Sequence, residues 1–242
     1  MNRLHAQLPA LQGVLSQPHS GGGPANLPSP SDVDAFIRAI RRKARFAEMH
    51  LDLLQGIEWD RVERLGRRIT GSPIPDSLSV RLSEASLVIE HPGAVTDHVY
   101  LAFDGLTAAL VNMTDTLARL VNLVYMLGID PRRASLLAVR DKCALTSPLG
   151  LILYDARHTD WLKKVRDLRG RCQHADIEEV LTLPTGSYAN RRQPCIDATY
   201  SWVNPSQLTL IVSYAQQAAA AAEDCIVATM TAIVGAPANP IT

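Results

Sequence analysis

Residues 95–127 read VTDHVYLAFDGLTAALVNMTDTLARLVNLVYML and form the longest periodic segment of the chain. Apolar side chains recur there at helical spacing over a broad surface, and Gly128 ends the pattern. These residues are Leu101, Leu106, Leu110, Leu117, Leu120, Val121 and Val124. A helix of this length, rising about 1.5 Å per residue, could span a whole domain. The sequence therefore predicts a helical bundle with this segment as its central element.

Helical patterns also occur on both sides of this segment. Ser31 or Asp32 can cap a helix whose apolar stripe runs from Phe36 to Leu54, with an arginine row on its opposite face. Further helices are expected over residues 59–69, 77–90, 131–144, 148–173 and 206–234. Residues 77–90 also alternate like a strand, so both alternatives stay open there.

A different pattern precedes the last predicted helix. Residues 196–202 alternate apolar and polar side chains, as a half-buried strand does, and residues 180–183 could pair with them. The predicted fold class is therefore mainly α, a helical bundle with a β-hairpin over residues 178–204 inserted before the last helix. Residues 1–30 are expected to be a flexible tail, 31–94 a helical extension, and 95–242 the bundle with its hairpin.

Composition excludes several classes of protein. Lysine plus arginine equals aspartate plus glutamate at 24 each, which argues against bulk nucleic-acid coating. Hydrophobic residues make up 47% and aromatic residues 5%, so the core must be mostly aliphatic. Four scattered cysteines indicate reduced thiols and a cytoplasmic location. The start does not resemble a signal peptide, and polar residues from Gln216 to Asp224 argue against a membrane span.

Most catalytic and cofactor motifs are missing from the sequence. It contains no Walker A loop, G-x-G-x-x-G, G-x-S-x-G or H-E-x-x-H pattern, so no cofactor is expected. Cys172 and His174 offer two metal ligands, but a structural zinc site needs four. We therefore expect no metal site.

One cationic stretch stands out, residues 161–174, which read WLKKVRDLRGRCQH. Trp161, Val165, Leu168 and Cys172 form its apolar stripe, and Arg169 lies on the flank of that stripe beside Leu162. His174 follows Arg169 by five residues, about 140° around a regular helix. The two side chains share a site if the helix loosens near Gly170, if the arginine swings across, or if a second copy of the chain completes the site.

The spacing Arg169 to His174 at the end of a late helix resembles the R-x4-H motif of HEPN domains, a superfamily of small helical proteins. The preceding residues 165–168, VRDL, are similar to the usual lead-in to that motif. By position the resemblance covers residues 95–234, with the N-terminal helices as an extension.

The resemblance implies a metal-independent endoribonuclease, often a toxin or defence effector, that works as a homodimer with a neutralising or activating partner. By carry-over from the family, Arg169 would hold the scissile phosphate and His174 would act as acid or base, roles that suit guanidinium and imidazole. Lys163, Lys164, Arg166 and Arg171 could attract the RNA backbone through their charge.

Two other interpretations stay open at this point. Active HEPN members commonly have a polar residue after the arginine, and this chain has Gly170, as a catalytically inactive interaction or dimerisation protein could. The structural alternative is an ion pair between Arg169 and a nearby acid, with His174 placed favourably at a helix end.

Overall fold

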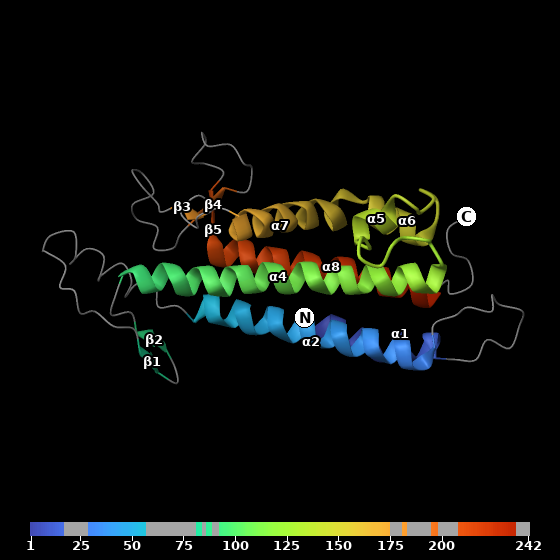
Figure 1. Cartoon of the computed structure of the whole chain (residues 1–242), viewed down its shortest axis with the longest axis horizontal. Coiled ribbons are helices and arrows are strands. Elements are labelled where there is room, and N and C mark those ends of the chain that lie inside the picture. The colour runs from blue at the N-terminus through green and yellow to red at the C-terminus, as the bar shows by residue number, and fades with distance from the viewer. Residues whose placement is uncertain are drawn as a thin grey trace, which may run out of the picture. The chain divides into compact units, whose positions relative to one another are not determined.

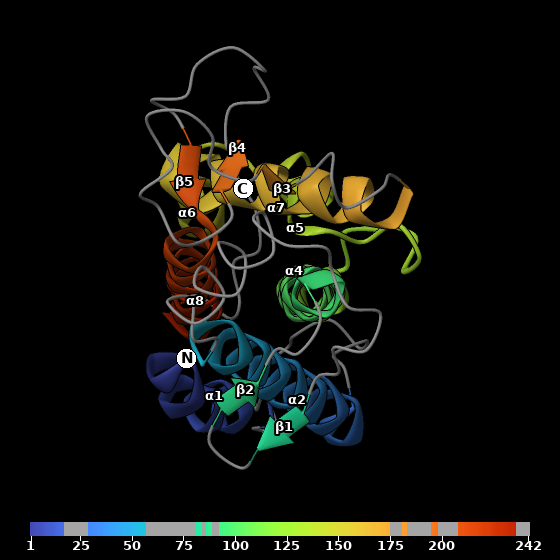
Figure 2. The ribbon, with the colours of Figure 1, turned by 90° about the vertical axis from the view of Figure 1, so that its left-hand side faces the viewer.

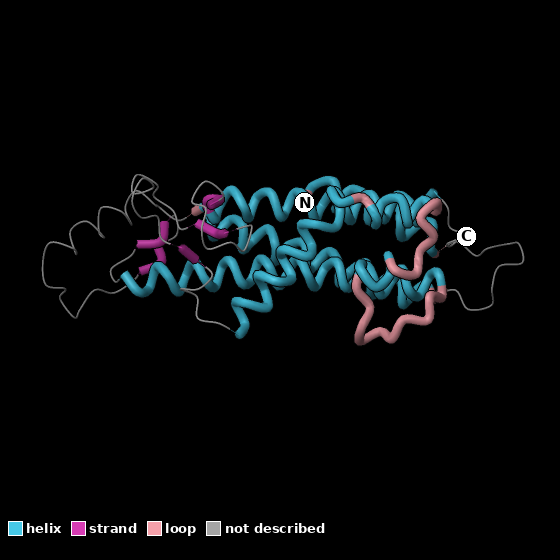
Figure 3. Tube along the Cα trace, turned by 90° about the horizontal axis from the view of Figure 1, so that it is seen from above, coloured by secondary structure: helices cyan, strands magenta, loops and turns pink. Residues whose placement is uncertain are grey.

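The structure is a computed structural model of the 242-residue chain. It describes residues 1–16, 29–56, 81–83, 86–88, 92–174, 181–182, 195–197 and 208–235, with side chains in 1–16, 29–56, 101–170 and 212–235. Helices predominate among these residues (Figure 3), which confirms the mainly α fold class.

The described elements follow in chain order. The helices are α1 (Asn2–Leu15), α2 (Pro30–Gln55), α4 (Pro92–Tyr125), α5 (Leu136–Arg140), α6 (Pro148–Tyr154), α7 (Ala156–His174) and α8 (Ile211–Gly235). The strands are β1 (Arg81–Ser83), β2 (Ser86–Val88), β3 (Leu181–Thr182), β4 (Cys195–Asp197) and β5 (Leu208–Leu210).

The chain divides into two compact units. Unit 1 comprises Met1–Ala47, Ala108–Arg166 and Ala218–Thr242, and unit 2 comprises Glu48–Thr107 and Asp167–Gln217. Helices α2, α4, α7 and α8 (Figure 1) each contribute residues to both units. The division therefore differs from the predicted boundary at residue 94, because helices distant in sequence pack together.

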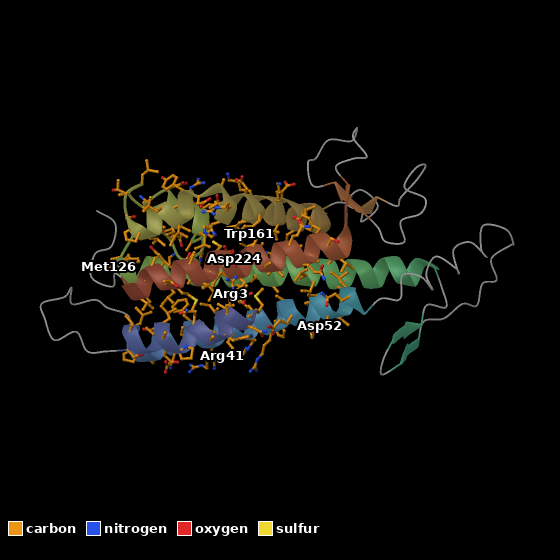
Figure 4. All side chains as sticks on the ribbon, turned by 180° about the vertical axis from the view of Figure 1, so that it is seen from behind. Arg3, Arg41, Asp52, Met126, Trp161 and Asp224 are labelled. Atoms are coloured by element: carbon orange, nitrogen blue, oxygen red, sulfur yellow. The ribbon has the colours of Figure 1, made fainter. Side chains whose placement is uncertain are left out.

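Unit 1 is a helical bundle around an aliphatic core. Segments of α1, α2, α4 and α8 lie side by side in it (Figures 1 and 2). On its surface, Arg3 of α1 and Asp224 of α8 form an ion pair (Figure 4). Its fully buried side chains include Leu4, Leu8, Leu11, Ile40, Leu110, Met113, Leu117, Leu162, Val165, Ile226 and Met230.

The predicted central helix is confirmed as α4. It ends at Tyr125, three residues before the predicted Gly128, and the next residue, Met126, has a φ of 52°. Gly128 adopts a φ of 70°, a conformation that glycine takes without steric cost. The Asn122 side chain then donates a hydrogen bond to the Ile129 carbonyl, 2.7 Å, and accepts one from the Ile129 amide, 3.0 Å. This pair of hydrogen bonds anchors the chain as it leaves the helix.

The predicted apolar surface of α4 is buried except at one residue. Leu101 is 63% exposed, whereas the buried residues are Leu106, Leu110, Leu117, Leu120, Val121 and Val124. The reason is geometric, because Leu101 lies about 140° from Leu106 around a regular helix.

The N-terminal prediction was wrong for residues 2–15, which form the helix α1 rather than a flexible tail. Leu4, Leu8 and Leu11 lie on one helical face and are fully buried. That burial stabilises a helix despite Pro9 in its interior. Residues 17–28, also assigned to the tail, lie outside the described residues.

The start of α2 also differs from the expected cap at Ser31 or Asp32. Pro30 occupies the first turn, and the Ser29 hydroxyl accepts a hydrogen bond from the Asp32 amide, 3.2 Å. The same hydroxyl donates to the Asp32 carboxylate, 2.7 Å, which holds the Ser29 side chain in its capping position.

The helix predicted over residues 148–173 is two helices, α6 and α7. Asp155 breaks it with an extended backbone, and its carboxylate accepts a hydrogen bond from the Arg157 amide, 2.9 Å, at the start of α7. The helix predicted over 131–144 is also shorter, because α5 begins only after its cap Ser135.

The segment over residues 77–90, expected as a helix with a strand as the alternative, contains the antiparallel strands β1 and β2, with Leu82 opposite Leu87. The strand alternation of the sequence was therefore the better guide there. The helix predicted over 59–69 lies outside the described residues.

Most of the predicted hairpin over residues 178–204 lies outside the described residues, so it stays a prediction. The described part pairs β3 with β4 antiparallel, and β4 with β5. The last helix begins at Ile211 rather than 206, because β5 precedes it.

The core of unit 2 contains an aromatic pair. The rings of Phe103 on α4 and Tyr214 on α8 are tilted at 52° with centroids 6.2 Å apart. Leu106 and Leu168 are also buried in this unit. These contacts fix the α4 and α8 segments of unit 2.

Among the described residues, one helix is long and apolar enough to cross a membrane, the Val212–Gly235 part of α8. Length and composition alone give this result. Within unit 1, Cys225, Ile226, Met230 and Ile233 of the same helix are fully buried in the core. This part of α8 therefore packs in the core of the bundle.

Candidate functional site

Helix α7 carries the predicted motif. Leu162, Val165 and Leu168 are buried along its apolar stripe, and Trp161 is half-buried, as the sequence predicts. The side chain of Cys172, the last residue of that stripe, lies outside the described side chains. The stripe sets the rotation of α7 and therefore the positions of its charged residues.

Arg169 lies on the flank of this stripe and is half-buried. Its Nε is shielded from solvent and has no hydrogen-bond partner among the described residues. Within the same part of the chain, no ion pair involves its guanidinium. A shielded charged donor without an acceptor is costly, so this arginine calls for a ligand or partner.

His174 is the final residue of α7, and its side chain lies outside those that the structure describes. The helix continues through Gly170 without a break, so the backbone does not loosen there. Arg169 and His174 are therefore about 140° and about 7.5 Å apart along one helix. Two of the three ways for these side chains to share a site therefore stay open. Either the long arginine side chain swings across, or a second copy of the chain completes the site.

The four predicted RNA-binding cations differ in their surroundings. Lys163 is exposed and lies 3.4 Å from the Asp160 carboxylate, and Lys164 is also exposed. Arg166 is instead ion-paired with Asp115 of α4 inside unit 1. The side chain of Arg171 is outside the described set. Arg166 therefore has a structural partner that the sequence did not reveal.

A second polar group, missed in the sequence, lies in unit 2. His50 of α2 packs against Gly105 of α4 so closely that an added Cβ there would clash with the imidazole. His50 Nδ1 and Asp104 Oδ1 are both buried and lack hydrogen-bond partners among the described residues. Burial lowers the pKa of His50, and the Asp104 carboxylate opposes this shift. The only signal in the sequence was a histidine on the flank of an apolar stripe.

The described part of the chain contains no cluster of metal ligands, because no three His, Cys, Asp or Glu side chains gather there. Cys143 and Cys225 are buried free thiols. Burial raises the pKa of Cys143 to about 11 and that of Cys225 to about 12. Both thiols are therefore protonated and unreactive near neutral pH.

No protein-family model, curated protein sequence or solved structure matches this chain. The resemblance to HEPN domains therefore depends on the α7 motif and the helical fold. In the described residues, Arg169 forms no ion pair, and its Nε has no hydrogen-bond acceptor.

Proposed function

We propose that this protein is a metal-independent endoribonuclease of HEPN type that acts as a homodimer with Arg169 and His174 in a composite site. The supporting observation is the half-buried Arg169, whose Nε has no acceptor among the described residues. The structural alternative expects a nearby acid there. A phosphodiester would supply the acceptor oxygens, and guanidinium binds phosphate through paired hydrogen bonds.

The proposed chemistry is an internal transesterification of RNA. The ribose 2′-hydroxyl loses its proton to an imidazole, and its oxygen attacks the adjacent phosphorus. The bond from phosphorus to the 5′ oxygen breaks, and that oxygen leaves with a proton from an imidazolium. Arg169 stabilises the negative charge that develops on the phosphoryl oxygens. The products carry a 2′,3′-cyclic phosphate and a 5′-hydroxyl.

The continuous helix α7 supports the dimeric form of the proposal. Arg169 and His174 diverge on one regular helix, and one imidazole cannot serve as acid and base at the same moment. Two chains would bring two arginines and two histidines to one cleft. Exposed Lys163 and Lys164 would attract the RNA backbone, while Arg166, paired with Asp115, would contribute less.

The proposal extends to the setting of the activity. We place it in the cytoplasm, where buried free thiols such as Cys143 stay reduced, as a toxin or defence effector with a neutralising or activating partner protein. We also propose that β3 and β4 are the ends of one hairpin over residues 178–204, and their antiparallel pairing supports this.

The test is cleavage of a panel of RNAs by the purified protein in EDTA. We expect 2′,3′-cyclic phosphate ends, and a loss of rate of about a hundredfold or more in Arg169→Ala and in His174→Ala. Because each proposed cleft needs a histidine from both chains, an excess of His174→Ala mixed with wild type should lower the wild-type rate if sites form between chains.

The matched control is Arg132→Ala, an exposed arginine before α5, which should cleave RNA at the wild-type rate. Melting temperatures of all variants show whether a loss of rate reflects unfolding. Intact RNA under every condition, or equal loss in the control, would contradict the nuclease. Loss of dimerisation without any wild-type cleavage would instead support the inactive interaction protein.

A further inference from the structure

A half-buried lysine joins two helices of unit 1. Lys43 of α2 is half-buried, and its Nζ donates hydrogen bonds to the Asn112 carbonyl, 3.1 Å, and to the Thr116 hydroxyl of α4. An ammonium has three donors, so one remains after these two bonds. Lys43 therefore holds a positive charge against the polar face of α4.

Two more cations reach the same part of α4. Arg166 of α7 pairs with Asp115, and its Nε is buried without an acceptor in the described residues. Arg119 follows Asp115 by four residues, so the two are neighbours on the helix surface. Arg119 is exposed and has no ion-pair partner in the described part of the chain.

Lys43, Asp115, Arg119 and Arg166 together form what we call the α4 cation cluster. Burial lowers the pKa of Lys43, and repulsion from Arg119 lowers it further, while Asp115 acts in the opposite direction. Among these four residues, three cations thus accompany one carboxylate, which leaves two positive charges in excess. All four residues belong to unit 1.

We infer that the α4 cation cluster is a binding site for a phosphate group. The excess of two charges matches a phosphate dianion. The donors not already used are the third Nζ hydrogen of Lys43 and the exposed guanidinium of Arg119, which suit two phosphate oxygens at once. Two helices supply these donors and Arg166 of a third helix adds its charge, so the site exists only in the folded bundle.

This site is distinct from the proposed nuclease motif. None of its residues is Arg169 or His174, and binding of phosphate requires no cleavage of RNA. If the nuclease proposal failed, the phosphate site would be unaffected. If no phosphate bound to the α4 cation cluster, the nuclease proposal would likewise be unaffected.

The experiment titrates inorganic phosphate into the full-length protein and follows binding by calorimetry, with sodium chloride at equal ionic strength as reference. The variant is Arg119→Gln, which removes one exposed cation without disturbing the core. We expect its phosphate affinity to fall about tenfold, the value of one charge-assisted hydrogen bond. The matched control, Arg132→Gln, removes an equivalent exposed charge elsewhere and should bind as the wild type does.

Melting temperatures provide a second measurement. Phosphate should raise the melting temperature of the wild type and of Arg132→Gln more than chloride does, and this gain should shrink in Arg119→Gln. The inference is overturned if the wild type binds no phosphate, or if Arg119→Gln binds it as tightly as the control does.

Competition identifies the source of the phosphate. Displacement by a short oligothymidylate, which contains only phosphodiesters and lacks the 2′-hydroxyl that cleavage needs, would point to a nucleic-acid backbone. Displacement by adenosine monophosphate alone would point to a terminal phosphate of a small ligand. Competition by neither, with inorganic phosphate bound, would identify the free ion.

Discussion

Neighbouring cations on one helix have different roles because their partners differ. Lys163 and Arg166 are three residues apart on α7, yet Lys163 stays at the surface while Arg166 pairs with Asp115, 51 positions away in sequence. In the sequence, both residues belong to the cationic stretch over residues 161–174. Only the fold brings Asp115 to Arg166, so sequence analysis could not separate them.

His50 provides a prediction at the scale of one side chain. Burial lowers its pKa in the folded protein, so the unfolded chain binds a proton at a higher pH than the folded chain. The free energy of unfolding should therefore decrease as the pH falls below the unfolded value of about 6.5. His50→Gln, which cannot titrate, should show a smaller decrease.

The measurement is urea unfolding of both proteins at about pH 7.5 and about pH 5.5, on either side of that value. Other histidines titrate equally in the two proteins, so the difference between them isolates His50. Identical losses of stability in wild type and variant would disprove the role given to its burial.

At the scale of elements, two glycines in helices have opposite surroundings. Gly150 in α6 is buried, and a Cβ there would clash with the Ala144 carbonyl oxygen. At Gly170 in α7, nothing lies within 4 Å of such a Cβ. Gly150 therefore allows the backbone of Ala144 to approach α6 closely, whereas Gly170 only weakens α7.

Gly150→Ala should therefore lower the free energy of unfolding by about 1–3 kcal/mol, because backbone must shift to admit the methyl group. Gly170→Ala should raise it by about 0.5–1 kcal/mol, since alanine is the better helix former. Denaturant unfolding of both variants measures the two changes. If both substitutions changed the free energy of unfolding in the same direction, the space around these glycines would not be what decides the effect of the substitution.

Element boundaries also show what periodicity can and cannot predict. The apolar pattern of α4 was long enough to predict that helix from sequence. The same pattern ran through Asp155 without interruption, although the chain bends there and its carboxylate caps α7. A cap depends on local hydrogen bonds, which an apolar stripe does not report.

At the scale of the whole molecule, α1 is an integral part of unit 1. Leu8 is fully buried in its core. Leu8→Ala should lower the free energy of unfolding by about 2–5 kcal/mol, through lost burial and the cavity left behind. Denaturant unfolding followed by circular dichroism measures this loss.

The control for this prediction is Arg3→Ala on the same helix. Its side chain and that of Asp224 are 62% and 51% exposed, so their ion pair contributes less than about 1 kcal/mol. A Leu8→Ala protein as stable as Arg3→Ala would mean that α1 does not belong to the core.

The sequence by itself determined the helical class, the course of α4 and the apolar stripe of α7 that carries Arg169. Each of these follows from side chains spaced along one segment, where periodicity fixes which face is buried. The burial of the N-terminal helix, the pairing of Arg166 and the α4 cation cluster were decided by tertiary structure. They depend on contacts between residues far apart in the chain, such as Lys43 with Thr116, and no local pattern encodes such a partner.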